Sequence, residues 1–164
     1  MRTDRRLVTS AFIALFACII FFLIAVPFME QDQSFHLFAD TRALFGIPNF
    51  WNVVSNFPFV VLGVAGLAKL RSVEDRVMFA GVLAIAAGSA YYHWMPNDAR
   101  LVWDRLPMTV VFMSLLPCVV GFGAAERFRV GMLALLVSCG VASVFWWQAT
   151  GDLRPYVLVQ FARF

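Results

Sequence analysis

The side chains best suited to chemistry are Ser89, His93 and Asp104, which lie in the stretch GSAYYHWMPNDARLVWDRLP from Gly88 to Pro107. Ser89 and His93 are four residues apart, so on a helix the two side chains share one face. Asp104 follows eleven positions later, just before another apolar run. A hydroxyl, an imidazole and a carboxylate at one rim of a membrane bundle would form a reaction site. The spacing alone also allows structural roles, with Asp104 as a helix cap, His93 bonded to a carbonyl and Ser89 as a packing residue.

The composition is typical of an integral membrane protein. Of 164 residues, 62% are hydrophobic and only 14% are charged, which is more apolar surface than a soluble domain of this size needs. The net charge of +3 comes without a basic patch interleaved with aromatic residues, so no nucleic-acid partner is predicted. The three cysteines fall within apolar runs and lack metal-ligand spacing, which indicates packing rather than a disulfide (Cys18, Cys118 and Cys139).

The apolar runs predict an all-α integral membrane protein, a single domain over residues 1–164 with about five transmembrane spans and a partial sixth. The charge-free run at residues 7–29 can cross a hydrocarbon layer of about 30 Å and is interpreted as an N-terminal anchor helix. The alternative is a signal peptide, although this run is longer than a usual signal core. The remaining segments are spans at Phe50–Leu70, Val77–Trp94, Leu106–Gly123 and Val130–Ala149, and a run too short to cross at Tyr156–Phe164.

Several residues within the spans have predicted packing roles. Asn52 and Asn56 share a face that should point into the bundle, because unpaired amides are costly in hydrocarbon, and Pro58 should kink the span. A stripe of small residues on the third span should let a neighbouring helix approach closely (Ala80, Ala84 and Gly88). Aromatic residues near span ends are expected to form an interfacial belt (Tyr91, Tyr92, Trp94, Trp103, Trp146 and Trp147).

The distribution of basic residues predicts a cytoplasmic N-terminus. With that orientation, eight lysines and arginines fall on the inner side and four on the outer side, as the positive-inside rule requires. The outer loops then bring most of the polar candidates to one rim, namely His36, Asp40, Asn52, His93, Asp104 and Asp152.

Four features together resemble the alkaline ceramidase family: Phe50-Trp51-Asn52, Ser55-Asn56, Ser89-x-x-x-His93, and Asp104 eleven positions later. That family belongs to a wider group of seven-helix membrane hydrolases that includes the adiponectin-receptor-like proteins. Asp104-Arg105-Leu106-Pro107 matches the family's acidic-residue-then-Leu-Pro helix start, and GDLRPYVLVQ at residues 151–160 looks like the bacterial branch. The resemblance covers residues 40–164, about the first four of seven core helices, so the chain is expected to be a C-terminally truncated member with the anchor at 7–29 added in front.

The resemblance implies hydrolysis of the amide bond of ceramide or a related N-acyl lipid. By this resemblance, His93 is the first of three histidine ligands of a zinc ion, Asp104 holds or deprotonates the zinc-bound water, and Ser89 supports the oxyanion. Zinc lowers the pKa of its water toward about 7 and polarises the carbonyl. The partners implied are the lipid bilayer and a ceramide-like lipid whose acyl chain enters the apolar bundle. The expected location is the bacterial inner membrane, with the site facing the periplasm.

The chain departs from the family pattern at the other two zinc ligands, a His-x-x-x-His pair on the family's last helix. Its only other histidine, His36, lies upstream of the matched region, and a catalytic zinc normally has three protein ligands. Three interpretations remain open: a fragment of a longer enzyme, an inactive lipid-binding or scaffold protein, or a site completed by a second subunit. His36 and Asp40 are weaker candidates for completing the zinc site.

A calcium site is a further candidate suggested by the resemblance. Family members often bind calcium through acidic residues just before the first core helix, where Asp40 and Asn49 fall. Asn49 stands where an acid is expected, and calcium prefers several oxygen ligands. The alternative is a helix cap and an ordinary loop acid.

Overall fold

The computed structural model describes residues 17, 19–120 and 126–161. Most of the expected anchor at residues 7–29 therefore lies outside the described residues, as do Cys18, the end of the span expected at Leu106–Gly123 and the last three residues of the chain. Within the anchor, residues 19–25 are helical and the chain loses helical structure from residue 26.

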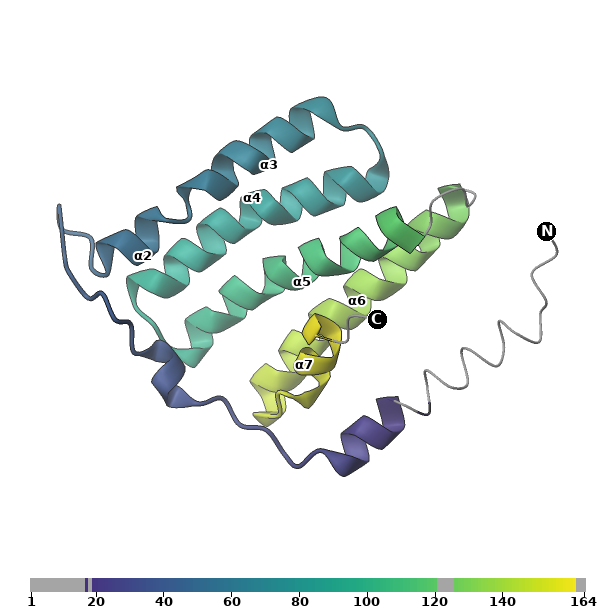
Figure 1. The fold of residues 1–164 in the computed structure, drawn as a ribbon, viewed down its shortest axis with the longest axis horizontal. Coiled ribbons are helices and arrows are strands. Elements are labelled where there is room, and N and C mark those ends of the chain that lie inside the picture. Colours follow the sequence, from purple (N-terminus) through teal and green to yellow (C-terminus); the bar gives the residue numbers. More distant parts are fainter. Residues whose placement is uncertain (1–16, 18, 121–125, 162–164) are drawn as a thin grey trace.

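The described part of the chain is all-helical, as predicted, and α3, α4, α5 and α6 lie side by side in one layer (Figure 1). The short helix α7 packs against α6, and the segment before α2 runs along one end of the layer. In chain order the elements are the 3-10 helix η1 (Gln33–His36), α2 (Phe50–Val54), α3 (Phe57–Lys69), α4 (Val73–Trp94), α5 (Asp98–Val120), α6 (Glu126–Thr150) and α7 (Arg154–Phe161).

Three helical stretches among the described residues are long and apolar enough to cross a membrane: Phe50–Lys69, Val73–Trp94 and Arg127–Thr150. This finding is compatible with a membrane protein. The count of five spans stays a prediction.

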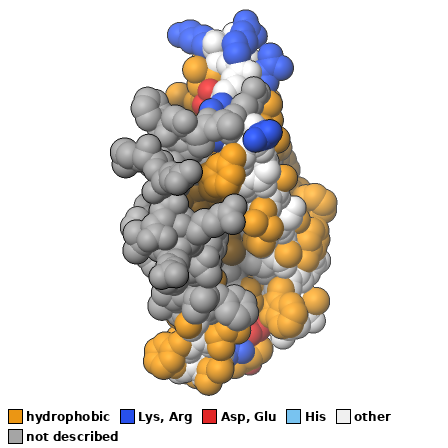
Figure 2. Space-filling view, turned by 90° about the vertical axis from the view of Figure 1, so that its right-hand side faces the viewer, with side chains coloured by type: hydrophobic (Ala, Val, Ile, Leu, Met, Phe, Trp, Pro, Cys, Tyr) orange, Lys and Arg blue, Asp and Glu red, His pale blue; other side chains and the backbone are white. Residues whose placement is uncertain are grey.

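Exposed basic residues gather over the connection between α3 and α4, at the top of Figure 2, namely Lys69, Arg71 and Arg76. This connection lies at the opposite end of α4 from His93.

Helix α4 begins four residues earlier than predicted, at Val73 instead of Val77. The Ser72 hydroxyl accepts a hydrogen bond from the Asp75 backbone N–H at 3.1 Å, which caps the helix. Glu74 and Asp75 lie in the first turn, where negative charge is favoured by the helix dipole. These charges lower the hydropathy of the segment, so the sequence pattern assigned it to a loop.

Helix α5 begins at Asp98, eight residues before the predicted start at Leu106. The Asn97 carboxamide oxygen accepts from the Arg100 backbone N–H at 2.9 Å and caps this helix. The connection between α4 and α5 is therefore only three residues long. Asp104 lies in the second turn of α5, so the interpretation of Asp104 as a helix cap is wrong.

The predicted close approach at α4 is confirmed at Gly88 only. A Cβ atom at Gly88 would clash with the Trp103 carbonyl oxygen of α5, whereas Ala80 and Ala84 are exposed. The second close contact lies at Gly81, where a Cβ would be 2.9 Å from Val111 Cγ2. Positions seven residues apart share a helix face, so α4 approaches α5 along that face.

The expected break in the second span occurs where α2 ends and α3 begins. The chain turns at Ser55 and Asn56, and Pro58 lies in the first turn of α3, where a missing N–H is tolerated. The side-chain amides of Asn52 and Asn56 are both paired, as predicted. Asn56 is buried and donates to the Asn52 carbonyl at 2.9 Å, while the Asn52 amide donates to the Asp40 carbonyl at 2.8 Å.

The core at the end of the layer near His93 combines aromatic and aliphatic side chains. Tyr92 and Trp147 are buried in it together with residues of α5 and α7, so their assignment to an interfacial belt is wrong. The other four aromatic residues of that belt are exposed, as expected. Tyr92 and Trp147 lie on the inward faces of their helices. Nearness to the end of a span does not show which face of the helix a residue occupies.

Arg154 joins α7 to the N-terminal helix. Its guanidinium donates to the carbonyls of Leu23 at 2.6 Å and Val26 at 3.0 Å, and it pairs with Asp152 at 2.8 Å. Carbonyls at a helix C-terminus lack intrahelical partners, so Arg154 supplies the missing donors.

Candidate active site

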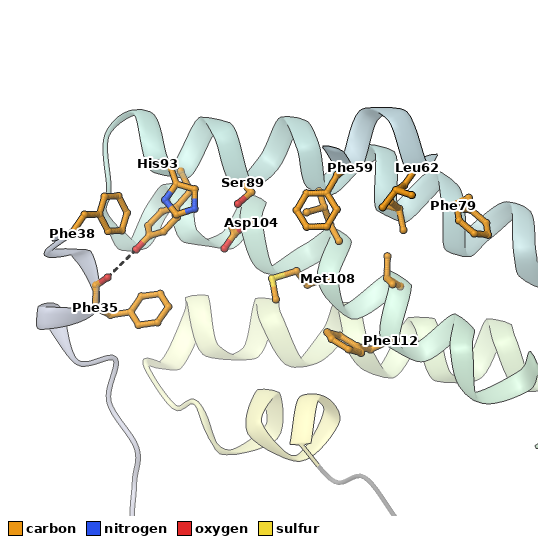
Figure 3. Close-up of a pocket in the computed structure, with 14 residues that line it drawn as sticks. Phe35, Phe38, Phe59, Leu62, Phe79, Ser89, His93, Asp104, Met108 and Phe112 are labelled. Atoms are coloured by element: carbon orange, nitrogen blue, oxygen red, sulfur yellow. Dashed lines mark hydrogen bonds between the residues drawn. The ribbon is translucent and has the colours of Figure 1, made fainter. Parts of the chain in front are cut away.

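A cavity of about 670 Å³ lies between α3, α4 and α5, within the size range of small-molecule sites. Ser89, His93 and Asp104 lie toward one end of it, where Phe35 and Phe38 form the rim, and most of the remaining lining runs away from them along the helices (Figure 3). That remainder is mainly aromatic and aliphatic, for example Phe59, Leu62, Phe79, Met108 and Phe112. The cavity is thus amphiphilic, with a short polar end and a long apolar arm.

Two helices supply the three polar groups. Ser89 and His93 share the face of α4 that their spacing predicts, and Asp104 comes from α5. In Figure 3 the Ser89 hydroxyl faces the Asp104 carboxylate, and both Ser89 and His93 are near enough to influence the charge of that carboxylate. The structure therefore brings together all three residues predicted from the sequence to act at one site.

Close contact between α4 and α5 makes this arrangement possible. Gly88 packs directly on the backbone of Trp103, and each is the chain neighbour of a site residue. Any side chain at Gly88 would separate Ser89 from Asp104.

His93 is held from two sides at the end of α4. The Asn49 amide donates to the His93 carbonyl at 2.9 Å, and the ring of Phe38 lies 4.9 Å from the imidazole, centroid to centroid. The His93 Nδ1 atom is buried and has no hydrogen-bond partner among the described residues. An unpaired buried nitrogen is costly, so this atom is suited to bind something the described chain does not supply.

The segment around η1 forms the rim of the polar end, where Phe35 and Phe38 line the cavity. His36 is bonded at both ring nitrogens, by the Tyr92 hydroxyl at 2.9 Å and the Asp98 carboxylate at 3.0 Å. Tyr92 also donates to the Phe35 carbonyl at 3.4 Å, the dashed line in Figure 3. His36 therefore holds the rim in place, and as placed it has no free nitrogen for a metal.

The two calcium candidates have other partners. Both carboxylate oxygens of Asp40 accept from the Arg42 side chain, at 2.9 and 2.7 Å. These bonds lower the pKa of Asp40 to about 2, because they stabilise the charged form. Asn49, at left-handed backbone angles, makes no side-chain cap and donates to His93 as described. A calcium ion at Asp40 would have to displace Arg42.

The described residues fit a zinc ion only in part. His93, with its unpaired Nδ1, and the neighbouring Asp104 are suitable donors for two positions of such a site. Among the described residues, no group of three or more His, Cys, Asp or Glu could hold a metal ion. A catalytic zinc site here would need at least one more donor from elsewhere.

The surroundings of Arg105, the residue next to Asp104, do not follow from the sequence. The guanidinium is buried between the rings of Trp147 at 4.2 Å and Tyr156 at 4.7 Å, a cation–π arrangement. One side-chain nitrogen donates to Gln31. Adjacent helical residues point in directions about 100° apart, so Arg105 packs toward α6 and α7 while Asp104 lines the cavity. No local pattern reveals a partner 42 or 51 residues away.

Comparison with family models decides which known proteins this chain resembles. The Ceramidase family model matches residues 43–161, which is most of the chain. The chain belongs to the ceramidase family. The match includes Asn49, Ser89, His93 and Asp104 and leaves out η1 and its histidine. No curated protein and no solved structure matched the chain.

Proposed function

We propose that this ceramidase-family protein hydrolyses the amide bond of ceramide or a related N-acyl lipid in a membrane, with zinc as its metal. The observation that carries the proposal is the convergence of Ser89, His93 and Asp104 on the polar end of an otherwise apolar cavity. A lipid amide has the matching shape, since its reactive group adjoins a long hydrocarbon chain.

Each of the three residues has a role in this proposal. Asp104 takes a proton from the attacking water as the new C–O bond forms, and returns it to the amine nitrogen as the C–N bond breaks. The Ser89 hydroxyl donates to the oxygen that becomes negative during attack. His93, with its unpaired Nδ1, is a ligand for zinc, and Asp104 is its neighbour. When bound, zinc supplies an acidified water and polarises the carbonyl.

The apolar arm of the cavity accounts for the lipid. The arm offers aromatic and aliphatic walls along its length, and these walls can make van der Waals contacts with a hydrocarbon chain. Substrate held in this arm would present its amide to Ser89 and Asp104. In this proposal the protein lies in a bacterial inner membrane with a cytoplasmic N-terminus, and the basic connection between α3 and α4, opposite the site, supports that orientation.

Zinc content and hydrolysis of a fluorescent ceramide by detergent-purified protein test the proposal. We expect Asp104→Asn and Ser89→Ala to lower turnover by about 100-fold or more, and His93→Ala to lose both zinc and turnover. Matched controls change the same residue types elsewhere: Asp75→Asn at the far end of α4 and Ser114→Ala, whose hydroxyl donates within α5. Turnover that survives in His93→Ala would refute the assigned roles.

A second function is favoured by one observation, the incomplete set of metal donors among the described residues. In that case the protein keeps the family's lipid cavity and acts as a lipid-binding or scaffold protein. It would bind ceramide-like lipids without zinc and without releasing fatty acid. Absence of zinc and of hydrolysis in wild-type protein, combined with measurable lipid binding, would establish this alternative.

A further inference from the structure

The far end of the apolar arm is formed by Phe79. In Figure 3 the polar groups lie at one end of the cavity, Phe59 and Met108 come next, and Phe79 lies farthest from His93. Phe79 belongs to α4, the same helix that carries Ser89 and His93. The two ends of the cavity are therefore joined by one rigid element.

Gly66 of α3 holds the Phe79 ring in place. A Cβ atom at Gly66 would lie 2.6 Å from Phe79 Cε1 and would clash with Cγ and Cδ1 as well. The ring thus rests directly against the backbone of α3. Since carbon atoms pack best at about 3.5–4.0 Å, the ring has no room to swing further toward α3 when a ligand reaches it.

The distance along α4 sets the length of hydrocarbon that fits. Ten residues separate Ser89 from Phe79, which at a rise of 1.5 Å per residue is about 15 Å. An extended alkyl chain advances roughly 1.25 Å per carbon, so about 15 Å corresponds to about twelve carbons. On α5, the eight residues from Asp104 to Phe112 give about 12 Å, or roughly ten carbons.

We propose that Phe79, held against Gly66, determines acyl-chain length, so that the cavity fully accommodates N-acyl chains of about ten to twelve carbons. The inference rests on the proposed function because it assumes that the amide lies beside Ser89 and Asp104. Each additional methylene adds contacts with the cavity walls until the chain reaches Phe79, and longer chains gain nothing more from the cavity.

The test is displacement of a fluorescent ceramide from detergent-purified protein by unlabelled ceramides with saturated acyl chains of six to eighteen carbons. We expect affinity to rise with length in wild-type protein and to level off at about ten to twelve carbons. Phe79→Ala should move that break to chains about three to four carbons longer, roughly the extent of the ring removed. Phe79→Leu should give a smaller shift and serves if the alanine variant is unstable.

Phe145→Ala is the matched control, because Phe145 is an exposed residue of α6 that does not line the cavity. The inference would be overturned if affinity showed no break with chain length in wild-type protein. It would also be overturned if Phe79→Ala left the break in place, or if Phe145→Ala moved the break by the same amount. The readout is binding, so the two proposals can fail separately. Wild-type protein that shows the break without hydrolysing ceramide would refute the proposed reaction and support the role of Phe79. Hydrolysis of ceramide combined with length-independent binding would support the reaction and refute the role of Phe79.

Discussion

Replacing Gly88 by alanine should damage both the stability of the protein and the proposed site. Gly88 is where α4 touches α5, and the new methyl group would clash with the Trp103 carbonyl oxygen. It would also lie 2.9 Å from the Trp103 carbonyl carbon and 3.4 Å from Pro107 Cγ. Backbone atoms of a helix cannot turn aside as a side chain can, so the two helices must separate locally.

The size of the effect follows from these contacts. Relaxing 2.9 Å to an ordinary carbon–carbon separation of about 3.5–4.0 Å requires a shift of roughly 0.6–1.1 Å, and the nearer Trp103 carbonyl oxygen requires a shift at the upper end of this range. Overpacking of this kind typically costs about 1–3 kcal/mol. Ser89 and Asp104 flank the contact on opposite helices, so the same shift pulls them apart. A displacement of about 1 Å between catalytic groups can lower turnover about 100-fold.

Thermal unfolding in detergent and ceramide hydrolysis should be measured for Gly88→Ala beside Gly131→Ala. Gly131 is an exposed residue of α6, and a Cβ there would meet nothing within 4 Å. That control should be neutral or more stable by about 0.5–1 kcal/mol, because alanine favours helix over glycine. If Gly88→Ala unfolds at the wild-type temperature and keeps wild-type turnover, the close approach of α4 and α5 does not position the site.

Two other predictions concern arginine side chains that hold segments outside the four long helices. Arg42 holds the pKa of Asp40 at about 2, so the pair stabilises the loop above about pH 4, the usual unfolded value, and that contribution is lost as the pH falls toward 2. In Arg42→Ala the Asp40 midpoint observed by NMR should rise toward the usual value of about 4 but stay below it, because the backbone N–H of residue 42 still donates to the carboxylate. Calcium, if it binds there, should bind this variant more tightly by calorimetry, and an Asp40 midpoint still near 2 would contradict this cause. Arg154→Ala should speed amide hydrogen exchange at residues 19–26, because the Leu23 and Val26 carbonyls at the end of this helix lose a donor. Arg154→Lys, which keeps the charge but loses the fork of donors, should restore only part of the protection, and unchanged exchange in the alanine variant would show that Arg154 does not hold this helix.

The candidate site could be predicted where it depends on a single helix. Ser89 and His93 share a face because they lie four residues apart, and helical periodicity requires no other information. The place of Asp104 on a helix could not be read from hydropathy, since the charged residues from Asp98 to Arg105 resemble a loop. The cap at Asn97 begins α5 early, and this cap is a local geometric feature that average hydropathy does not register.

The sequence by itself determined the all-helical class, the apolar stretches and the residues that mark the ceramidase family, because hydropathy and spacing are properties of short stretches of chain. Tertiary structure alone decided which groups meet. In the folded protein His36 bonds to Tyr92 and Asp98, and Arg105 lies between two aromatic rings. Tertiary structure also turned Asp104 toward Ser89 and His93 and left an amphiphilic cavity beside them. Most of these partners lie far apart in the chain, and their contacts depend on how α4, α5, α6 and α7 pack, which no periodicity within one helix records.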